Sequence, residues 1–254
     1  MSPSILFHRF RKARVLAIPL PPIIVTLVGL VAAGQLMARP WAGTTALMSH
    51  GLVTPLFLVT LIALGCALGI ILVVGRIRVE DVGLDPDYVG RGFGLVVMTW
   101  AAAQVVGVIP RVVANRPVVL DPVFEHGSRW ELFGTLLTSL GTASLEEIVF
   151  RGFLLIQIYL LLLRKPERSE QALYVATAVV LLLSSLAALP HDLPFASWRA
   201  AVEHELIFAG GGLFLTWLFL RTRNIFFVIG VHALLLAPTP IVAGPTGGGR
   251  WFHP

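Results

Sequence analysis

The chain has 254 residues, of which 56% are hydrophobic and 13% charged, and its mean hydropathy is +0.85. This composition is too apolar for an ordinary soluble domain and indicates an integral membrane protein. The net charge of +5 would suggest a nucleic-acid partner in a soluble chain, but the basic residues gather at the ends of apolar runs, where membrane orientation explains them. We therefore expect no nucleic-acid binding. The single cysteine, Cys66, lies in an apolar run and is expected to be a buried small side chain.

Apolar segments follow one another along the chain at about the length of membrane-spanning helices, roughly 17 to 25 residues. Pro19, Pro21 and Pro22 are expected to kink the first of them or delay its start. The segment 132–163 is too long for one simple span at about 1.5 Å of rise per residue, so we expect a break within 139–144. The predicted fold is all-α, a polytopic transmembrane helical bundle of seven spans, or eight if 132–163 hides another. The segments are 15–37, 52–74, 93–109, 132–163, 173–189, 206–220 and one that begins near Ile225.

The distribution of basic residues predicts the orientation of these spans. With a cytoplasmic N-terminus, twelve lysines and arginines fall in cytoplasmic segments and six on the other side, with Arg151 counted as intramembrane. An excess of basic residues on the cytoplasmic side is the usual pattern in membrane proteins. We therefore expect a multi-pass protein in contact with membrane lipid, and an eighth span would reverse the later half of this topology.

A charged cluster within Ser144–Phe153 interrupts the apolar segments. Each ionised side chain deep in a bilayer costs roughly 2.5 to 3.5 kcal/mol, so these residues must pair, neutralise or face a wet cavity. Ser144 and Glu147 have the spacing of a capping box, which predicts that a helix starts here. Glu147 and Arg151 are four residues apart on that helix, so we expect an ion pair. Glu146 is rotated from Glu147 by about 100°, which leaves its carboxylate available for chemistry.

Two histidines also stand in apolar surroundings, His191 at the end of the 173–189 segment and His232 within the last segment. Burying titratable groups from three helices is costly unless they converge, so we expect one site. A carboxylate with histidines suits the hydrolysis of an amide or ester, in which Glu146 removes a proton from water and an imidazole holds the water or donates to the oxyanion.

The same three residues could instead bind zinc, since two histidines and a glutamate form a common catalytic zinc set. His204 and Glu205 do not complete the zinc-protease motif His-Glu-x-x-His, because Phe208 stands where the second histidine is needed. Glu203, His204 and Glu205 are more typical of charges at a helix start. We therefore favour a metal-free site without a cofactor, with zinc as the alternative.

These motifs together resemble the CAAX protease and bacteriocin-processing enzymes, a family abbreviated CPBP or Abi. The similarity rests on the Glu146–Arg151 element, on His191 after a serine-containing apolar helix, and on the Ile229–Leu234 stretch around His232. It covers about residues 130 to 240. Accordingly, we divide the chain into N-terminal transmembrane helices and loops (1–129), a CPBP-like catalytic membrane core (130–240) and an irregular tail (241–254).

The resemblance implies a role for each site residue. Glu146 would be the general base, His191 would help to hold the water, and His232 would line the oxyanion site. Glu147 and Arg151 would be structural partners. The sequence departs from the family's usual pattern at Ala187, where an aromatic residue is common, and at Leu236, where asparagine or aspartate is common.

The function implied is that of an intramembrane endopeptidase, acting as a glutamate protease or a metalloprotease on a membrane-associated peptide or protein, with prenylated or CAAX-like substrates among the candidates. Because the chain is compact and looks bacterial, we expect it in the inner membrane of a bacterium. The alternative is a catalytically weak or inactive member that binds a peptide or partner protein in an immunity or assembly role, which Leu236 favours. A proton-coupled carrier is a third hypothesis, against which stands the absence of repeated halves in the sequence.

Overall fold

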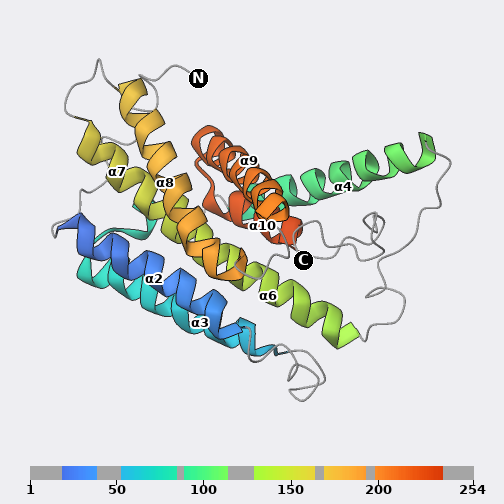
Figure 1. The fold of residues 1–254 in the computed structure, drawn as a ribbon, viewed down its shortest axis with the longest axis horizontal. Coiled ribbons are helices and arrows are strands. Elements are labelled where there is room, and N and C mark those ends of the chain that lie inside the picture. Colours follow the sequence, from blue (N-terminus) through green and yellow to red (C-terminus); the bar gives the residue numbers. More distant parts are fainter. Residues whose placement is uncertain are drawn as a thin grey trace.

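The structure is a computed structural model that describes residues 19–38, 53–84, 89–113, 129–163, 169–192 and 198–236. Within these ranges every regular element is helical and no strand occurs, which confirms the predicted all-α class. Figure 1 shows the helices, and the π- and 3₁₀-helical elements are written η. In chain order they are α2 (Leu20–Ala38), α3 (Pro55–Leu68), η4 (Gly69–Val74), η5 (Val79–Val82), α4 (Val89–Val113), α6 (Arg129–Glu147), η7 (Ile148–Leu154), α7 (Leu155–Leu162), α8 (Ser169–Asp192), α9 (Trp198–Thr222) and α10 (Ile225–Leu236).

The bundle is arranged around the long rod that α6, η7 and α7 form together (Figure 1). α3 and α10 pack against α6, α2 packs against α3 and α8, and α8 packs against α7 and α9. α4 packs against α10, and its far end extends away from the other helices (Figure 1). The rod supplies several of the largest fully buried side chains, Phe150, Phe153 and Tyr159, so the core of the protein lies along it.

Described helices lie at the positions of all the predicted apolar segments. Two stretches, Leu56–Val74 and Ser169–Ala188, are long and apolar enough to cross a membrane by length and composition, and shorter apolar helices cover Leu20–Gly34, Gly92–Ala102 and Ile225–Leu236. These helices agree with a membrane protein. The number of spans, seven or eight, stays a prediction.

The break that we expected within 139–144 is wrong. α6 runs without interruption to Glu147, and Ser144 lies inside this helix instead of capping its start. Gly141 marks the place where α6 contacts α3, because a Cβ there would lie 3.0 Å from Thr60 Oγ1. Small residues in membrane helices let neighbouring helices approach closely. The small side chains of this stretch therefore serve packing and do not end the helix.

The irregularity of the rod lies instead just after the two glutamates. η7 is a π-helix, and all seven of its residues are buried. Gly152 lies in it where the carbonyl of Val82, the last residue of η5, approaches, since a Cβ on Gly152 would stand 2.8 Å from that oxygen. Single turns of π-helix inside α-helices are frequent at functional sites. The rod is therefore continuous but changes its winding next to the charged cluster.

Two smaller expectations concern α2 and Cys66. Pro19 precedes the first residue of α2, and Pro21 and Pro22 lie in its first turn, where a missing N–H leaves no hydrogen bond unmade. The prolines therefore set the start of the helix, as expected. Cys66 was expected to be buried, but it is exposed on α3. Apolar character does not require burial inside the protein when the surroundings are lipid.

Candidate active site

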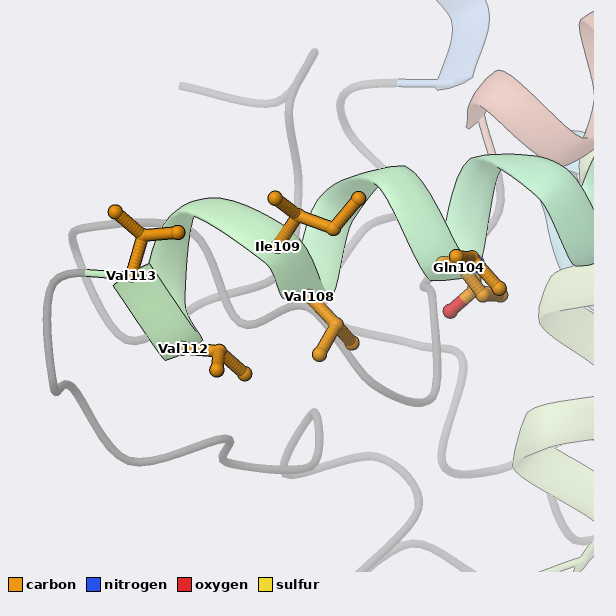
Figure 2. A pocket seen from close by; sticks show the side chains of 6 residues that line it. Gln104, Val108, Ile109, Val112 and Val113 are labelled. Atoms are coloured by element: carbon orange, nitrogen blue, oxygen red, sulfur yellow. The ribbon is translucent and has the colours of Figure 1, made fainter.

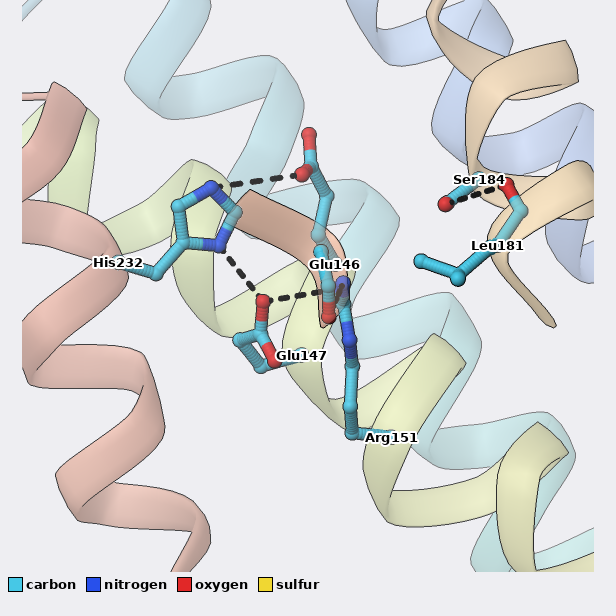
Figure 3. Close-up of polar contacts among 7 residues, drawn as sticks. Glu146, Glu147, Arg151, Leu181, Ser184 and His232 are labelled. Atoms are coloured by element: carbon cyan, nitrogen blue, oxygen red, sulfur yellow. Dashed lines mark hydrogen bonds and ion pairs between the residues drawn. The ribbon is translucent and has the colours of Figure 1, made fainter. Parts of the chain in front are cut away.

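Buried charged side chains from two parts of the rod meet a histidine from α10 (Figure 3). Glu146 and Glu147 are the last two residues of α6, Arg151 belongs to η7, and His232 lies in the second half of α10. The exposed fractions of these four residues are 7%, 0%, 3% and 8%, respectively. Buried charges are stable only when they are paired and hydrogen-bonded, so their contacts define the site.

The predicted ion pair between Glu147 and Arg151 is present. Arg151 Nη1 donates to Glu147 Oε1 at 2.9 Å, within one helical turn of the rod. Arg151 Nη2 donates to the backbone carbonyl oxygen of Gly212 in α9 at 3.3 Å. A Cβ on Gly212 would lie 3.1 Å from that nitrogen, so a glycine here leaves room for the guanidinium. α9 thus contributes a backbone acceptor to the site.

His232 stands between the two glutamates (Figure 3). Its Nδ1 lies 2.7 Å from Glu147 Oε1, the same oxygen that accepts from Arg151. Its Nε2 lies 3.8 Å from Glu146 Oε2. Because Glu147 occupies Nδ1, Nε2 is the ring nitrogen that is turned to Glu146. The sequence predicted that Glu146 and His232 would converge, and the contact between Glu147 and His232 is an addition from the structure.

Two buried polar atoms of this cluster make no hydrogen bond to the described residues. Glu147 Oε2 and Arg151 Nε are buried, and neither has a hydrogen-bond partner among the described residues. Buried polar atoms without partners are uncommon in folded proteins and usually have a functional reason or a bound water. The pair of Glu147 and Arg151 can therefore accept further contacts with water or with a bound molecule.

The comparison with protein families bears directly on this site. Residues 128–236 match the family model described as type II CAAX prenyl endopeptidase, Rce1-like. These residues form an Rce1-like domain. The segment covers α6 to α10 and includes every candidate site residue, and its extent agrees with the 130–240 that the CPBP resemblance predicted. A domain of this family indicates a membrane-embedded enzyme of the CAAX protease type. Neither the curated proteins nor the solved structures contain a match to the chain.

The third predicted catalytic residue of the Rce1-like domain, His191, lies in the last turn of α8, which continues through Pro190 to Asp192. The sequence placed the end of this apolar segment at about residue 189 with His191 at its end, and the helix extends slightly further. The side chain of His191 lies outside the described part of the structure, as do those of Glu203 and His204. The role of His191 therefore stays a prediction, and so does the zinc set that would include it.

Of the three glycines of α9, only Gly212 reaches the site of the Rce1-like domain. A Cβ on Gly210 or Gly211 would meet nothing within 4 Å, whereas one on Gly212 would press on Arg151 and on Leu181 of α8. Gly212 is therefore the glycine of this triplet that lets α9 lie close to Arg151 and to α8.

An apolar hollow of about 340 Å³ lies outside the Rce1-like domain, along the second half of α4 (Figure 2). None of its six described lining residues is an acid or a histidine. It therefore offers no group for acid–base chemistry, and the cluster around Glu147 remains the candidate site. The lining residues are Gln104, Val105, Val108, Ile109, Val112 and Val113.

Proposed function

We propose that this protein is an intramembrane endopeptidase that hydrolyses a peptide bond of a membrane-associated substrate. The observation that carries the proposal is the approach of Glu146 Oε2 to His232 Nε2, at 3.8 Å, inside an Rce1-like domain. This gap is too long for a direct hydrogen bond, but a water beside the two atoms can contact both. A carboxylate and an imidazole that share a water are the groups that peptide hydrolysis needs.

Glu146 is the proposed general base. It takes a proton from the water while the water oxygen attacks the carbonyl carbon of the scissile peptide bond, which forms a tetrahedral oxyanion. When the C–N bond breaks, the same proton passes from Glu146 to the leaving amine. Glu146 therefore returns to its starting state, and the water is divided between the two products.

His232 is proposed to stabilise the oxyanion that forms in this reaction. With a proton on Nε2, its ring donates to the developing oxyanion, whose charge it stabilises. Glu147 holds the other ring nitrogen at 2.7 Å, and Arg151 holds Glu147 at 2.9 Å. A catalytic imidazole is commonly oriented by a carboxylate in this way. Glu147 and Arg151 are therefore supporting residues that fix the direction of Nε2.

His191 completes the proposal by helping to hold the water from the end of α8. Our proposal needs no metal, because Glu146 supplies the base. If zinc is used instead, Glu146, His191 and His232 would be its ligands, and His232 would bind through Nε2 because Nδ1 contacts Glu147. Bound zinc would supply a more acidic water.

The proposed substrate is a peptide or membrane protein that reaches the site from the surrounding lipid. Prenylated or CAAX-like peptides are the first class to test, since the matched family is described as a CAAX prenyl endopeptidase. We propose that the protein resides as a multi-pass protein in the inner membrane of a bacterium. Within it, residues 130–240 would be the catalytic core, preceded by the membrane helices of 1–129 and followed by the tail 241–254.

The test is cleavage of a library of membrane peptides, with and without prenyl groups, by the protein purified in lipid nanodiscs. Replacing the base, Glu146→Gln, is expected to lower the cleavage rate by about 10²- to 10⁴-fold. The matched control is Glu170→Gln, which changes an exposed glutamate in the first turn of α8 and should leave the rate unchanged. Each protein is also assayed after treatment with a chelator.

The possible results separate the mechanisms. Cleavage that depends on Glu146 and survives the chelator supports the metal-free mechanism, whereas loss of wild-type cleavage on chelation replaces it by the zinc alternative. Cleavage by Glu146→Gln at the rate of the Glu170→Gln control would contradict the role of Glu146. An absence of cleavage by well-folded wild-type protein across the whole library would count against a peptidase.

A further inference from the structure

A short folded turn between η4 and α4 reaches into the bundle close to the site. We call residues 75–84 the wedge. A hydrogen bond from Gly75 N to Ile70 O, at 2.8 Å, joins its first residue to η4. A second, from Leu84 N to Val79 O at 3.0 Å, folds its last residues. It includes the 3₁₀-helix η5, and Ile77 and Val82 are buried. The wedge is therefore an ordered, partly buried element.

The wedge meets η7 at Gly152. A Cβ added to Gly152 would lie 2.8 Å from the Val82 carbonyl oxygen and 3.5 Å from Val82 Cβ. A separation under about 3 Å is not tolerated, and because the nearest atom belongs to the backbone, the wedge and the rod would have to move apart. Gly152 directly follows Arg151, whose guanidinium holds Glu147. The contact thus lies next to a residue of the site.

The opposite side of the wedge meets the junction of α9 and α10. Gly83 has a φ of +81°, a conformation that favours glycine. A Cβ on it would lie 3.3 Å from Phe219 Cε2 and 3.4 Å from Ile225 Cβ. The wedge therefore fits tightly between the rod on one side and α9 and α10 on the other.

The residues that touch the wedge share helix faces with site residues. Phe219 follows Gly212 by seven positions in α9, and Ile225 precedes His232 by seven positions in α10. Seven residues make about two turns of α-helix, or roughly 10 Å along the axis, so each pair lies on one face. The wedge therefore contacts the three elements that supply Arg151, the Gly212 carbonyl and His232.

We propose that the wedge sets the spacing of η7, α9 and α10, and thereby the contact between Glu147 and His232. Val82, Gly83 and Gly152 are then positioning residues for the reaction. Close-packed interiors transmit small displacements, and a misplacement of about 1 Å at a reacting group can cost about 10²-fold in rate. The catalytic consequence rests on the proposed peptidase function, whereas the geometric consequence for His232 does not.

The test uses a matched pair of glycine substitutions in the two π-helices. Gly152→Ala pushes a methyl group onto the Val82 carbonyl, whereas Gly69→Ala in η4 adds the same group where nothing lies within 4 Å. Gly83→Ala disturbs the wedge from its other side. Val82→Ala loosens the wedge without a clash, and it serves as the mild variant if Gly152→Ala and Gly83→Ala reduce folding.

The first measurement is independent of cleavage. The protein is labelled with ¹⁵N-histidine in nanodiscs, and the ring signals of His232 are identified by their loss in His232→Gln. We expect Gly152→Ala, Gly83→Ala and Val82→Ala to shift these signals, and Gly69→Ala to leave them in place. His232 signals that are unchanged in all three folded wedge variants would overturn the proposal.

The second measurement is the division of the effect between kcat and KM. The wedge variants are expected to lower kcat by about 10- to 10²-fold with KM nearly unchanged, because the proposed effect of the wedge is on the position of His232, and Gly69→Ala should match wild type. Shifted His232 signals with wild-type kcat would overturn the catalytic role of the wedge. If wild-type protein cleaves nothing, the peptidase proposal fails, and the ¹⁵N spectra still decide whether the wedge positions His232.

Discussion

A single carboxylate oxygen holds the candidate site together. Glu147 Oε1 accepts from Arg151 at 2.9 Å and lies 2.7 Å from His232 Nδ1, and the exposed fraction of Glu147 is 0%. A buried ion pair need not stabilise a protein relative to apolar residues of the same size, but removing one partner leaves the other charge buried alone. Glu147 is therefore expected to matter for stability and orientation, and Glu146 for chemistry.

This division predicts that substitutions of the two neighbouring glutamates differ in their effect on the free energy of unfolding. Glu147→Ala should lower the free energy of unfolding by about 3–5 kcal/mol, because Arg151 loses its partner. The double variant Glu147→Leu with Arg151→Met should recover most of that loss while remaining inactive. Denaturant unfolding in mixed micelles measures these changes, with Glu146→Ala, which leaves the ion pair intact, as the comparison. A loss for Glu147→Ala no larger than the ~1 kcal/mol of an exposed ion pair would contradict the prediction.

At the scale of helices, the site depends on how closely α9 approaches the rod. Gly212 brings its carbonyl within 3.3 Å of Arg151 Nη2, and a side chain there would press on Arg151 and on Leu181. Its neighbour Gly211 faces open space. The two adjacent glycines therefore differ in what a methyl group would disturb, although both lie inside the same helix.

Gly212→Ala is accordingly expected to reduce stability by about 1–3 kcal/mol through overpacking, and to reduce cleavage because the guanidinium is displaced. Gly211→Ala is the matched control and should be neutral or slightly stabilising, since alanine favours helix over glycine. Thermal unfolding and cleavage rates of the two variants in the same nanodiscs provide the comparison. Equal unfolding temperatures and cleavage rates of the two variants would show that the contact of Gly212 with Arg151 affects neither stability nor cleavage.

For the whole molecule, the distribution of basic residues predicts which helix ends face the cytoplasm, and this orientation stays a prediction. The rod runs from the start of α6 at one end of the bundle to the end of α7 near the start of α8 at the other (Figure 1). Glu80 in the wedge, Glu170 at the start of α8 and Arg221 at the end of α9 lie in or beside segments that were predicted to be cytoplasmic. Trp130, at the start of α6, lies beside a segment that was predicted to face the non-cytoplasmic side.

Cysteine labelling tests this topology. Cys66 is exposed and is first replaced by alanine, so that it does not react. Single cysteines at the exposed positions Glu80, Glu170 and Arg221 are expected to react with a membrane-impermeant maleimide only from the cytoplasmic face, and a cysteine at Trp130 only from the other face. Labelling of the Glu80 and Glu170 variants from different faces would show that an extra span lies between them.

Much of the fold and part of the site follow from rules that act along the chain. Long apolar runs located the helices, and the spacing of four residues predicted the pair between Glu147 and Arg151, because both patterns repeat within a single helix. The separate functional role of Glu146 stays a prediction. Glu146, His191 and His232 could be grouped in advance because isolated titratable groups are too costly in an apolar environment, and the place of His191 in that group stays a prediction.

The sequence by itself thus determined the all-helical class, the Rce1-like segment and the buried charges that require a common site. Only the tertiary structure decided that α6 continues through its small residues, that Glu147 binds His232 across 85 positions of the chain, and that Arg151 binds a backbone oxygen 61 positions away. The spacing of residues along one helix carries no information about which face of a distant helix packs against it. That approach is fixed by packing, here by Gly141, Gly152 and Gly212, whose missing side chains set how near neighbouring elements can come.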